Sequence, residues 1–312
     1  MLAFYAERNL MIKGLSITPP ILGRISIGKV VEKNGKRLPE KDDQFTITTQ
    51  VQSRDGWVSH PYDGDLRQKI NGEKLRSIPI RVLFNDPELN LRAEYCLFDR
   101  KNGRPLCVGN GERCRRYASS QVQSLPCPSP DECEFSDGLC KPYGRLNVKI
   151  GDDDDLGTFI FRTTGYNSIR NLTARLHYYR AVSGNLLACL PLQLRLRGKS
   201  TTQSHRSPIY YVDITIRDGL SLVDAVNKAK EEHQLRLTNG VDQNALDAAA
   251  ESGFANGAFE STAEEMVDIA EEFLLGQADA GQSAGKSDKE GAQQKANLTD
   301  KLQERIDQKS AG

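Results

Sequence analysis

Hydrophobic and polar residues alternate with a period of two through much of the first 217 residues. This alternation is typical of β-strands that bury one face and expose the other. It is clearest over residues 189–197, where four leucines alternate with Pro191, Gln193 and two arginines. Further strands, separated mainly by Gly, Pro, Asn or Asp, are predicted at residues 21–31, 45–51, 78–84, 91–99, 144–150, 157–163 and 209–217.

An apolar stripe with helical spacing predicts one helix, which Asn167 or Ser168 caps and Gly184 ends. A second helix is predicted over residues 221–234, with Ser221 as its N-cap. Strands outnumber helices, so the sequence predicts an α+β fold, a mainly antiparallel β-sheet domain with one or two packed helices. The stripe of the first helix consists of Ile169, Leu172, Leu176 and Tyr179.

The composition changes after about residue 235, where Ala, Gly and acidic residues replace large apolar ones. This predicts a largely disordered acidic C-terminal tail. Within the tail, residues 261–275 predict a short amphipathic helix that either covers a bare patch of its own domain or binds a partner. The chain is therefore divided into an N-terminal extension (1–11), a β domain (12–219), a helix (220–235) and a tail (236–312). The predicted tail helix has a capping box, Ser261 with Glu264, and the apolar stripe Met266, Ile269, Phe273 and Leu274.

The net charge is zero, but the two parts of the chain carry opposite charges. Residues 1–217 contain 33 Lys and Arg against 23 Asp and Glu, and residues 218–312 contain 9 against 19. A surface of one sign suits a polyanion, usually nucleic acid; alternatively, the arginines pair with Asp152–Asp155 or with the acidic tail. The candidate DNA contacts in the acid-free stretch 156–212 are Arg162, Arg170, Arg175, Arg195, Arg197, Lys199 and Arg206.

Five of the seven cysteines fall within 34 residues, in a proline-rich segment (107–140) interpreted as a loop. No signal peptide or membrane span is apparent, so a cytoplasmic location is expected, where clustered cysteines bind metal or catalyse more often than they form disulfides. Zinc takes four ligands, and turns supply thiolates readily. The spacing matches no standard zinc finger, and the alternative is a set of reduced thiols without metal. The five are Cys107, Cys114, Cys127, Cys133 and Cys140.

Four protein ligands would close the coordination sphere, so the zinc is expected to be structural. The cations beside the cysteines would then face phosphates, or would offset the thiolates and nearby acids. No P-loop, nucleophile elbow, dinucleotide fingerprint or His-Glu-x-x-His motif occurs, so no catalytic residue is predicted. A metal-dependent hydrolase is the alternative, and it requires one cysteine to leave the metal. A protein-only adaptor is a third possibility. The cations in question are Arg115, Arg116, Lys141 and Arg145.

Several short motifs follow one another in a recognisable order. They are residues 21–28 (ILGRISIG), 106–111 (LCVGNG), 126–128 (PCP), 140–146 (CKPYGRL) and 161–164 (FRTT). Together they resemble the recombination-directionality-factor-like family of phages and integrative conjugative elements. The resemblance covers about residues 12–219, and residues 140–146 are its most specific part.

The resemblance implies a metal-binding segment in which four recurring positions match Cys107, Cys127, Cys133 and Cys140, with Cys114 as an alternative ligand. It also implies an accessory protein without a catalytic centre, which binds a serine integrase on DNA and switches it from integration to excision. Relatives from conjugative elements are often labelled metal-binding protein or hydrolase, and the long acidic tail departs from the compact phage form. The expected cofactor is structural Zn²⁺, and the expected partners are DNA and a recombinase or replication protein, with no membrane.

Overall fold

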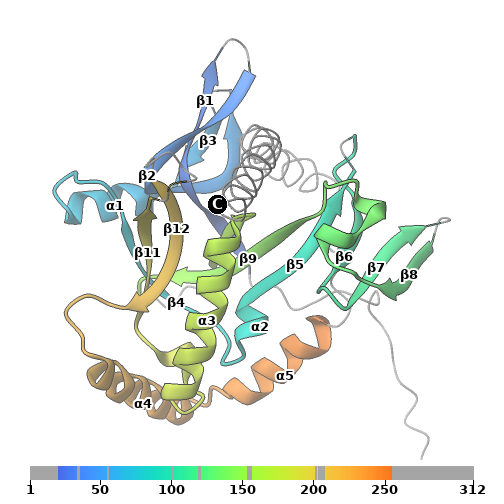
Figure 1. Cartoon of the computed structure of the whole chain (residues 1–312). Coiled ribbons are helices and arrows are strands. Elements are labelled where there is room, and N and C mark those ends of the chain that lie inside the picture. Colours follow the sequence, from blue (N-terminus) through green and yellow to red (C-terminus); the bar gives the residue numbers. More distant parts are fainter. Residues whose placement is uncertain are drawn as a thin grey trace, which may run out of the picture.

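A computed structural model describes residues 20–33, 36–54, 56–99, 101–118, 121–152, 157–200, 202 and 208–254. The described strands form one sheet, in the order β3-β2-β1-β10-β9-β5-β6-β7-β8, with the branch β12-β11-β4 joined to β9. Every pairing is antiparallel except that of β1 with β10. The prediction of a mainly antiparallel α+β fold is therefore confirmed (Figure 1).

The elements have the following bounds. The strands are β1 (Ile21–Lys33), β2 (Lys36–Ser53), β3 (Gly56–Ser59), β4 (Ser77–Arg81), β5 (Leu91–Phe98), β6 (Pro105–Gly109), β7 (Arg113–Ala118), β8 (Gln121–Pro126), β9 (Lys141–Ile150), β10 (Thr158–Thr163), β11 (Leu192–Lys199) and β12 (Ile209–Ile216). The helices are α1 (Pro61–Lys69), α2 (Pro87–Asn90), α3 (Tyr166–Val182), α4 (Leu222–Thr238) and α5 (Gln243–Phe254), with 3-10 turns η1 (Pro130–Glu132), η2 (Glu134–Ser136) and η3 (Leu187–Cys189). None of these described helices is both long and apolar enough to span a bilayer.

Strand β9 connects the two parts of the sheet. Its first half pairs with β5, its middle pairs with β10, and its last residues pair with β4. Gly144 in this strand lets α3 approach closely, because a Cβ there would lie only 2.9 Å from Cγ1 of Ile169. The segment that most resembles the family thus begins the strand that joins the β5–β8 part to the rest of the sheet with its helices. We call this rest of the molecule the body.

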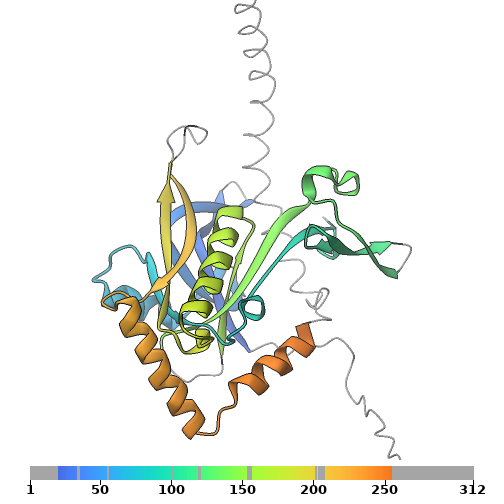
Figure 2. The ribbon, with the colours of Figure 1, turned by 60° about the horizontal axis from the view of Figure 1, so that its bottom comes forward.

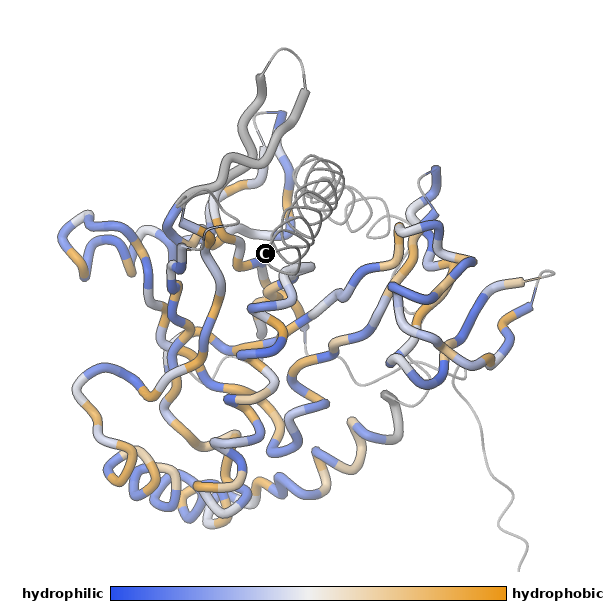
Figure 3. The backbone as a smooth tube through the Cα atoms, viewed as in Figure 1, coloured by the Kyte–Doolittle hydropathy of each residue, from blue (hydrophilic) through white to orange (hydrophobic). Residues whose placement is uncertain are grey.

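The body is held together by a large apolar core. Alternate positions of β2, β4, β9, β10, β11 and β12 contribute to it, and α3 packs its predicted apolar stripe against them. Figure 3 shows this alternation of hydrophobic and hydrophilic positions along the strands. The largest fully buried side chains include Phe45, Phe159, Phe161, Leu172 and Leu176.

Helix α3 also covers the outer edge of β12. The Ser168 hydroxyl accepts a hydrogen bond from the Val212 amide at 3.1 Å, and Asn167 bonds Lys199 at 2.8 Å. The predicted cap was therefore wrong: the N-cap is Gly165, because both polar side chains are used to bind the neighbouring hairpin. An edge strand paired in this way is less available to pair with other chains.

Two predicted strands lose three residues at one end in the structure. The strand predicted at 78–84 ends at Arg81, because the buried Asn90 side chain bonds the amides of Leu83 and Phe84, both at 3.0 Å. The strand predicted from residue 189 begins at Leu192, because Cys189 ends a buried 3-10 turn. Both segments keep their apolar side chains buried, so periodicity predicted burial better than it predicted strand ends.

The C-terminal described residues form two helices rather than one. Helix α4 begins at the predicted cap Ser221, which forms a capping box with Asp224, and it extends past the predicted end to Thr238. Helix α5 was not predicted; it contacts the body through Asp247, which accepts from the Asn85 amide at 3.2 Å, and through Gln243, which donates to the Leu83 carbonyl at 2.9 Å. Figure 2 shows the two helices as a V along one side of the molecule. The helix predicted at 261–275 lies outside the described residues.

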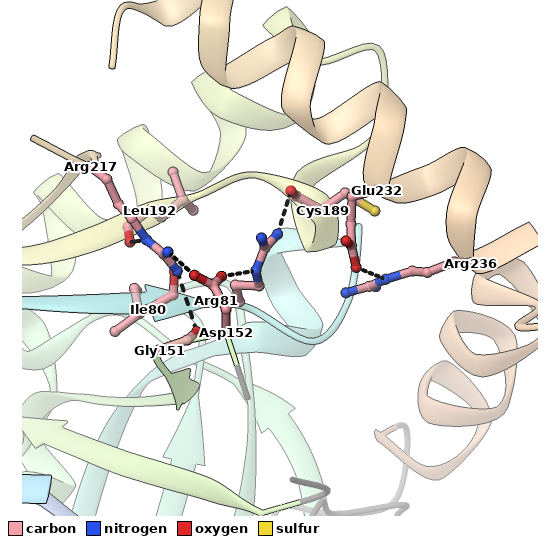
Figure 4. Close-up of polar contacts among 9 residues, drawn as sticks. All are labelled: Ile80, Arg81, Gly151, Asp152, Cys189, Leu192, Arg217, Glu232 and Arg236. Carbon is pink, nitrogen blue, oxygen red and sulfur yellow. Dashed lines mark hydrogen bonds and ion pairs between the residues drawn. The ribbon is translucent and has the colours of Figure 1, made fainter. Parts of the chain in front are cut away.

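Asp152 joins β4 to the chain that follows β12 (Figure 4). Its carboxylate accepts a hydrogen bond from Nε of Arg81 at 2.7 Å and also forms an ion pair with Arg217. Arg217 donates in turn to the Leu192, Ile80 and Gly151 carbonyls. These hydrogen bonds, led by that from Arg217, hold the pKa of Asp152 at about 2, below its ordinary value. The first residue of the acidic run is thus part of the structure of the body.

Candidate metal site and cationic face

The cysteine-rich segment is not the loop that the sequence suggested. Cys107 lies in β6, Cys114 lies in β7, and only Cys127, Cys133 and Cys140 lie between regular strands. Alternate residues of β6 and β7 bury these two thiols beside Leu97, and partly buried leucines surround them. The strands β5 to β8 form an arm that extends away from the body in both views (Figures 1 and 2).

Four of the five clustered thiols line one small cavity on one side of the arm. The cavity is lined by Cys107, Cys127, Cys133 and Cys140, together with side chains that include Arg116 and Phe135. It measures about 10 Å³, room for roughly one water-sized sphere. Cys114 does not line it, and its thiol instead lies 3.6 Å from the Pro126 carbonyl. A space of this size suits an ion rather than an organic substrate.

Local backbone geometry explains how the thiols come together. A Cβ on Gly109 would lie 2.7 Å from Cβ of Cys114 and 3.0 Å from Sγ of Cys127, so glycine is needed for Cys127 to reach the end of β6. The Cys127 amide bonds the Glu112 carbonyl at 2.8 Å, which fixes the turn after β8. Cys133 ends η1 and begins η2, so its sulfur comes from a turn.

The electrostatics show that the thiols interact. Burial raises the pKa of Cys140 to about 12, and the neighbouring Cys107, Cys133 and Cys127 add to the rise. Burial likewise raises the pKa of Cys114 to about 11, helped by a hydrogen bond with Cys107. Arg116 lies against the site, 3.9 Å from Sγ of Cys133 and 3.9 Å from the centre of the Phe135 ring. Thiols with raised pKa values stay protonated at neutral pH unless a strong competitor for the sulfur, such as a metal ion, displaces the proton.

The set fits zinc in the number and type of donors but not in their present spacing. In the part of the chain that the structure describes, no three His, Cys, Asp or Glu side chains are grouped closely enough to hold a metal ion as they stand. A bound ion would have to draw the four sulfurs of the cavity inward to about 2.3 Å from itself.

Comparison with known protein families identifies the family of this chain. A family model described as Gp3-like, recombination directionality factor-like, matches residues 22–217, more than half of the chain. The chain belongs to the recombination directionality factor-like family. Searches of curated proteins and of solved structures gave no match. The family match ends at β12, so α4 and α5 lie beyond it.

The predicted DNA-contacting cations of this family member fall into separate groups. On the side of α3 and β11, Arg175 and Arg197 both pair with the buried Asp213, at 3.1 and 2.7 Å, and Arg195 pairs with Asp218. Their partners are thus neither Asp152–Asp155 nor the tail. Arg116 lies at the thiol cavity, Arg170 is exposed on α3, Lys199 donates to Asn167 of α3, and Arg206 lies outside the described residues.

The remaining predicted cations lie on one face of the sheet. Lys141, Cys96, Val108 and Arg115 are successive cross-strand partners from β9 to β7, and cross-strand partners point to the same side. Arg145 is paired in register with Arg92 on one side and Arg162 on the other. We call this surface the cationic face and define it as Arg24, Arg92, Arg115, Lys141, Arg145, Arg162 and the single carboxylate Glu94.

The thiol cavity lies on the opposite side of the same strands, because Tyr95 and Leu97 line it whereas Glu94 and Cys96 point to the cationic face. The Glu94 carboxylate forms ion pairs with Arg92 at 2.9 Å and with Arg145 at 3.1 Å. Reasoning from the sequence missed Arg24 and Arg92, which lie outside the acid-free stretch. Only the pairing of β1 with β10 and of β5 with β9 places them beside Arg162 and Arg145.

Proposed function

We propose that this protein is a non-enzymatic accessory factor in the DNA recombination of a mobile element, which binds a recombinase and contacts DNA. Membership of the recombination directionality factor-like family supports the recombination role. The observation that carries the rest is the two-sided arm: an ion-sized thiol cavity lies on one side, and the other side belongs to the cationic face, which continues onto β9, β10 and β1. This arrangement suits a stiffened surface for binding a polyanion, not a pocket for a substrate.

In this proposal a zinc ion is held by Cys107, Cys127, Cys133 and Cys140. The ion supplies a cross-link, and the four side chains connect β6, the turn after β8, the 3-10 segment and the start of β9. The small apolar cluster of the arm contains few large side chains, so the cross-link would fix strands that burial alone holds weakly. Cys114 would stay outside the ligand set.

Metal analysis of the purified full chain tests the zinc part. One equivalent of zinc is expected, and cobalt substitution should give the intense charge-transfer absorption of a tetrathiolate site. A cobalt spectrum with three sulfurs and an exchangeable water would instead favour the metal-dependent hydrolase, because that chemistry requires an open coordination position.

A reconstituted reaction tests the recombination part. The full chain is added to the serine recombinase of the same mobile element, with plasmids that carry either the integrated or the unintegrated attachment sites. The chain is expected to stimulate excision and to inhibit integration without cutting DNA by itself. Equal rates of both reactions with and without the chain would contradict the proposal.

Binding of duplex DNA by the full chain across a salt series separates the DNA accessory from a protein-only adaptor. Phosphate contacts predict a steep loss of affinity as salt rises, because each contact releases condensed counterions. An adaptor that recognises only a protein would show no such binding.

A further inference from the structure

The cationic face contains apolar side chains that are buried. Cys96 is 2% exposed, Tyr143 is 3% exposed and Val108 is 5% exposed, and Phe98 packs edge-on against Tyr143 with ring centres 5.7 Å apart. Register places Cys96 and Val108 between Lys141 and Arg115, and Tyr143 two residues from Arg145. The face therefore has an apolar middle with cations around it.

The described residues account for part of this burial, because the Arg145 guanidinium lies over the Tyr143 ring, 5.5 Å from its centre. Helix α3, which covers the middle of the sheet, lies on the other face, where Ile169 meets Gly144. Apolar side chains are buried because another layer removes them from water. A segment that combines apolar and acidic side chains would complete such a layer over this face.

Residues 261–275 have the complementary chemistry. They contain five acids, no Lys or Arg, and an apolar stripe at helical spacing. A helix of this sequence would present Met266, Ile269 and Phe273 to an apolar strip, with carboxylates alongside to meet arginines. Two other long segments lie outside the described residues, and neither complements a cationic surface as well: residues 1–19 carry two cations against one acid, and residues 276–312 carry six of each.

The end of α5 lies on the same side of the molecule as the arm. The last described residue, Phe254, ends α5 on the side of the molecule from which the arm extends (Figures 1 and 2). Ser261 follows seven residues later, and an extended chain of that length reaches about 25 Å. A short tether of this kind gives the segment a high effective concentration at the face.

We propose that residues 261–275 dock on the cationic face of the same chain, with their apolar stripe over Cys96, Val108 and Tyr143 and their carboxylates toward Lys141, Arg145 and Arg162. The docked segment occupies the cations that the proposed function assigns to DNA, so DNA must displace it. This inference goes beyond the proposed function and is tested without DNA, so either can fail alone.

Zero-length carbodiimide cross-linking of the full chain tests where the segment lies. Lys141 is the lysine of the cationic face, and the expected product joins it to Glu264, Glu265, Asp268, Glu271 or Glu272. Mixing heavy- and light-isotope chains shows whether the cross-link forms within one chain. Cross-links of Lys141 to Glu7, or mixed-isotope products only, would overturn the assignment in favour of the N-terminal segment or of a second copy.

Alkylation of Cys96 gives an independent readout. The double variant Ile269→Asp/Phe273→Asp is expected to raise the rate of Cys96 labelling by at least about tenfold, since the covering layer opens more often. Cys189, buried in the body, should label at an unchanged rate and so reports that the fold is intact. The matched control is Leu298→Asp/Leu302→Asp, which places the same charges later in the tail. Protection of Cys96 that survives the first variant would overturn the proposal, whatever the protein does with DNA.

Discussion

The body and the arm belong to one sheet, yet they bury different side chains. The body surrounds Phe45, Phe159 and Phe161 with a continuous layer of leucine and isoleucine, whereas the cluster on the thiol side of the arm buries only Leu97, Cys107 and Cys114. Burial of large apolar side chains can hold the body together without help. The cluster on the thiol side of the arm is much smaller, so the cross-link proposed for its thiols would matter more there than in the body.

The largest effect is expected from removing a thiol of the cavity. Cys127→Ser should abolish stoichiometric zinc binding and increase hydrogen exchange throughout β7 and β8, because a structural zinc contributes about 10 kcal/mol or more to folding. Zinc content and exchange mass spectrometry check this. A Cys127→Ser protein that keeps both its metal and its melting temperature would falsify the zinc assignment.

Cys114→Ser is the matched control for that variant. Cys114 is 3% exposed but does not line the cavity, so the substitution should retain one equivalent of zinc and cost only some packing energy. Loss of metal from Cys114→Ser together with retention in Cys107→Ser would reverse the choice between these two cysteines.

In the body, removing a buried side chain should lower the stability of the fold without changing the zinc content. Leu172→Ala removes a fully buried side chain of α3 and is expected to lower the free energy of unfolding by about 2–5 kcal/mol, with zinc content unchanged. Urea unfolding followed by circular dichroism measures this. Leu237→Ala, half exposed on α4, is the control and should change stability by no more than about 0.5 kcal/mol.

A smaller effect is expected at Asp152, and it depends on pH. Because Arg217 and Arg81 hold the pKa of Asp152 at about 2, its ionised form stabilises the folded protein at any pH above the ordinary value of 3.8. That contribution is lost as the pH falls from about 4 to 2. Asp152→Asn should therefore lower the melting temperature at neutral pH, and the difference from the parent protein should shrink towards pH 2. A difference that stays constant over this range would show that the carboxylate charge does not matter.

The smallest changes concern DNA. Arg145→Gln and Arg162→Gln are each expected to reduce the salt dependence of duplex binding by about one unit in the log–log slope. Arg54→Gln, exposed in the turn before β3, should leave the slope unchanged. If the tail segment competes for the cationic face, Ile269→Asp/Phe273→Asp should bind DNA more tightly than the parent chain. Fluorescence anisotropy measures the four variants and the parent chain.

Alternation and helical spacing predicted most strands of the body and the extent of α3, because burial on one face leaves a local pattern in the sequence. They could not predict that β1 pairs with β10 in parallel, since that contact joins residues far apart in the chain. The cap of α3 was missed for the same reason, because Ser168 bonds Val212 of a strand that comes later. Helix α5 was missed because its sequence is rich in alanine and its contacts with the body, Asp247 with Asn85 and Gln243 with Leu83, have no local signal.

For the candidate site, the count of cysteines predicted which segment matters, but the structure was needed to show that two of the thiols lie in strands and four surround one cavity. The cations were harder to predict. A run without acids identified Arg175 and Arg197, which turned out to share Asp213, whereas Arg24 and Arg92 were overlooked. Charge along the sequence is a weak guide here, because ion partners come from other strands.

Strand β9 takes part in three pairings at once, with β5, β10 and β4. A partner that pulled on the arm would therefore load the hydrogen bonds of β9 in shear along the strand rather than open them one at a time. Mechanical load on the arm would pass through β9 and then β4 to the hairpin of β11 and β12 on the far side of the molecule.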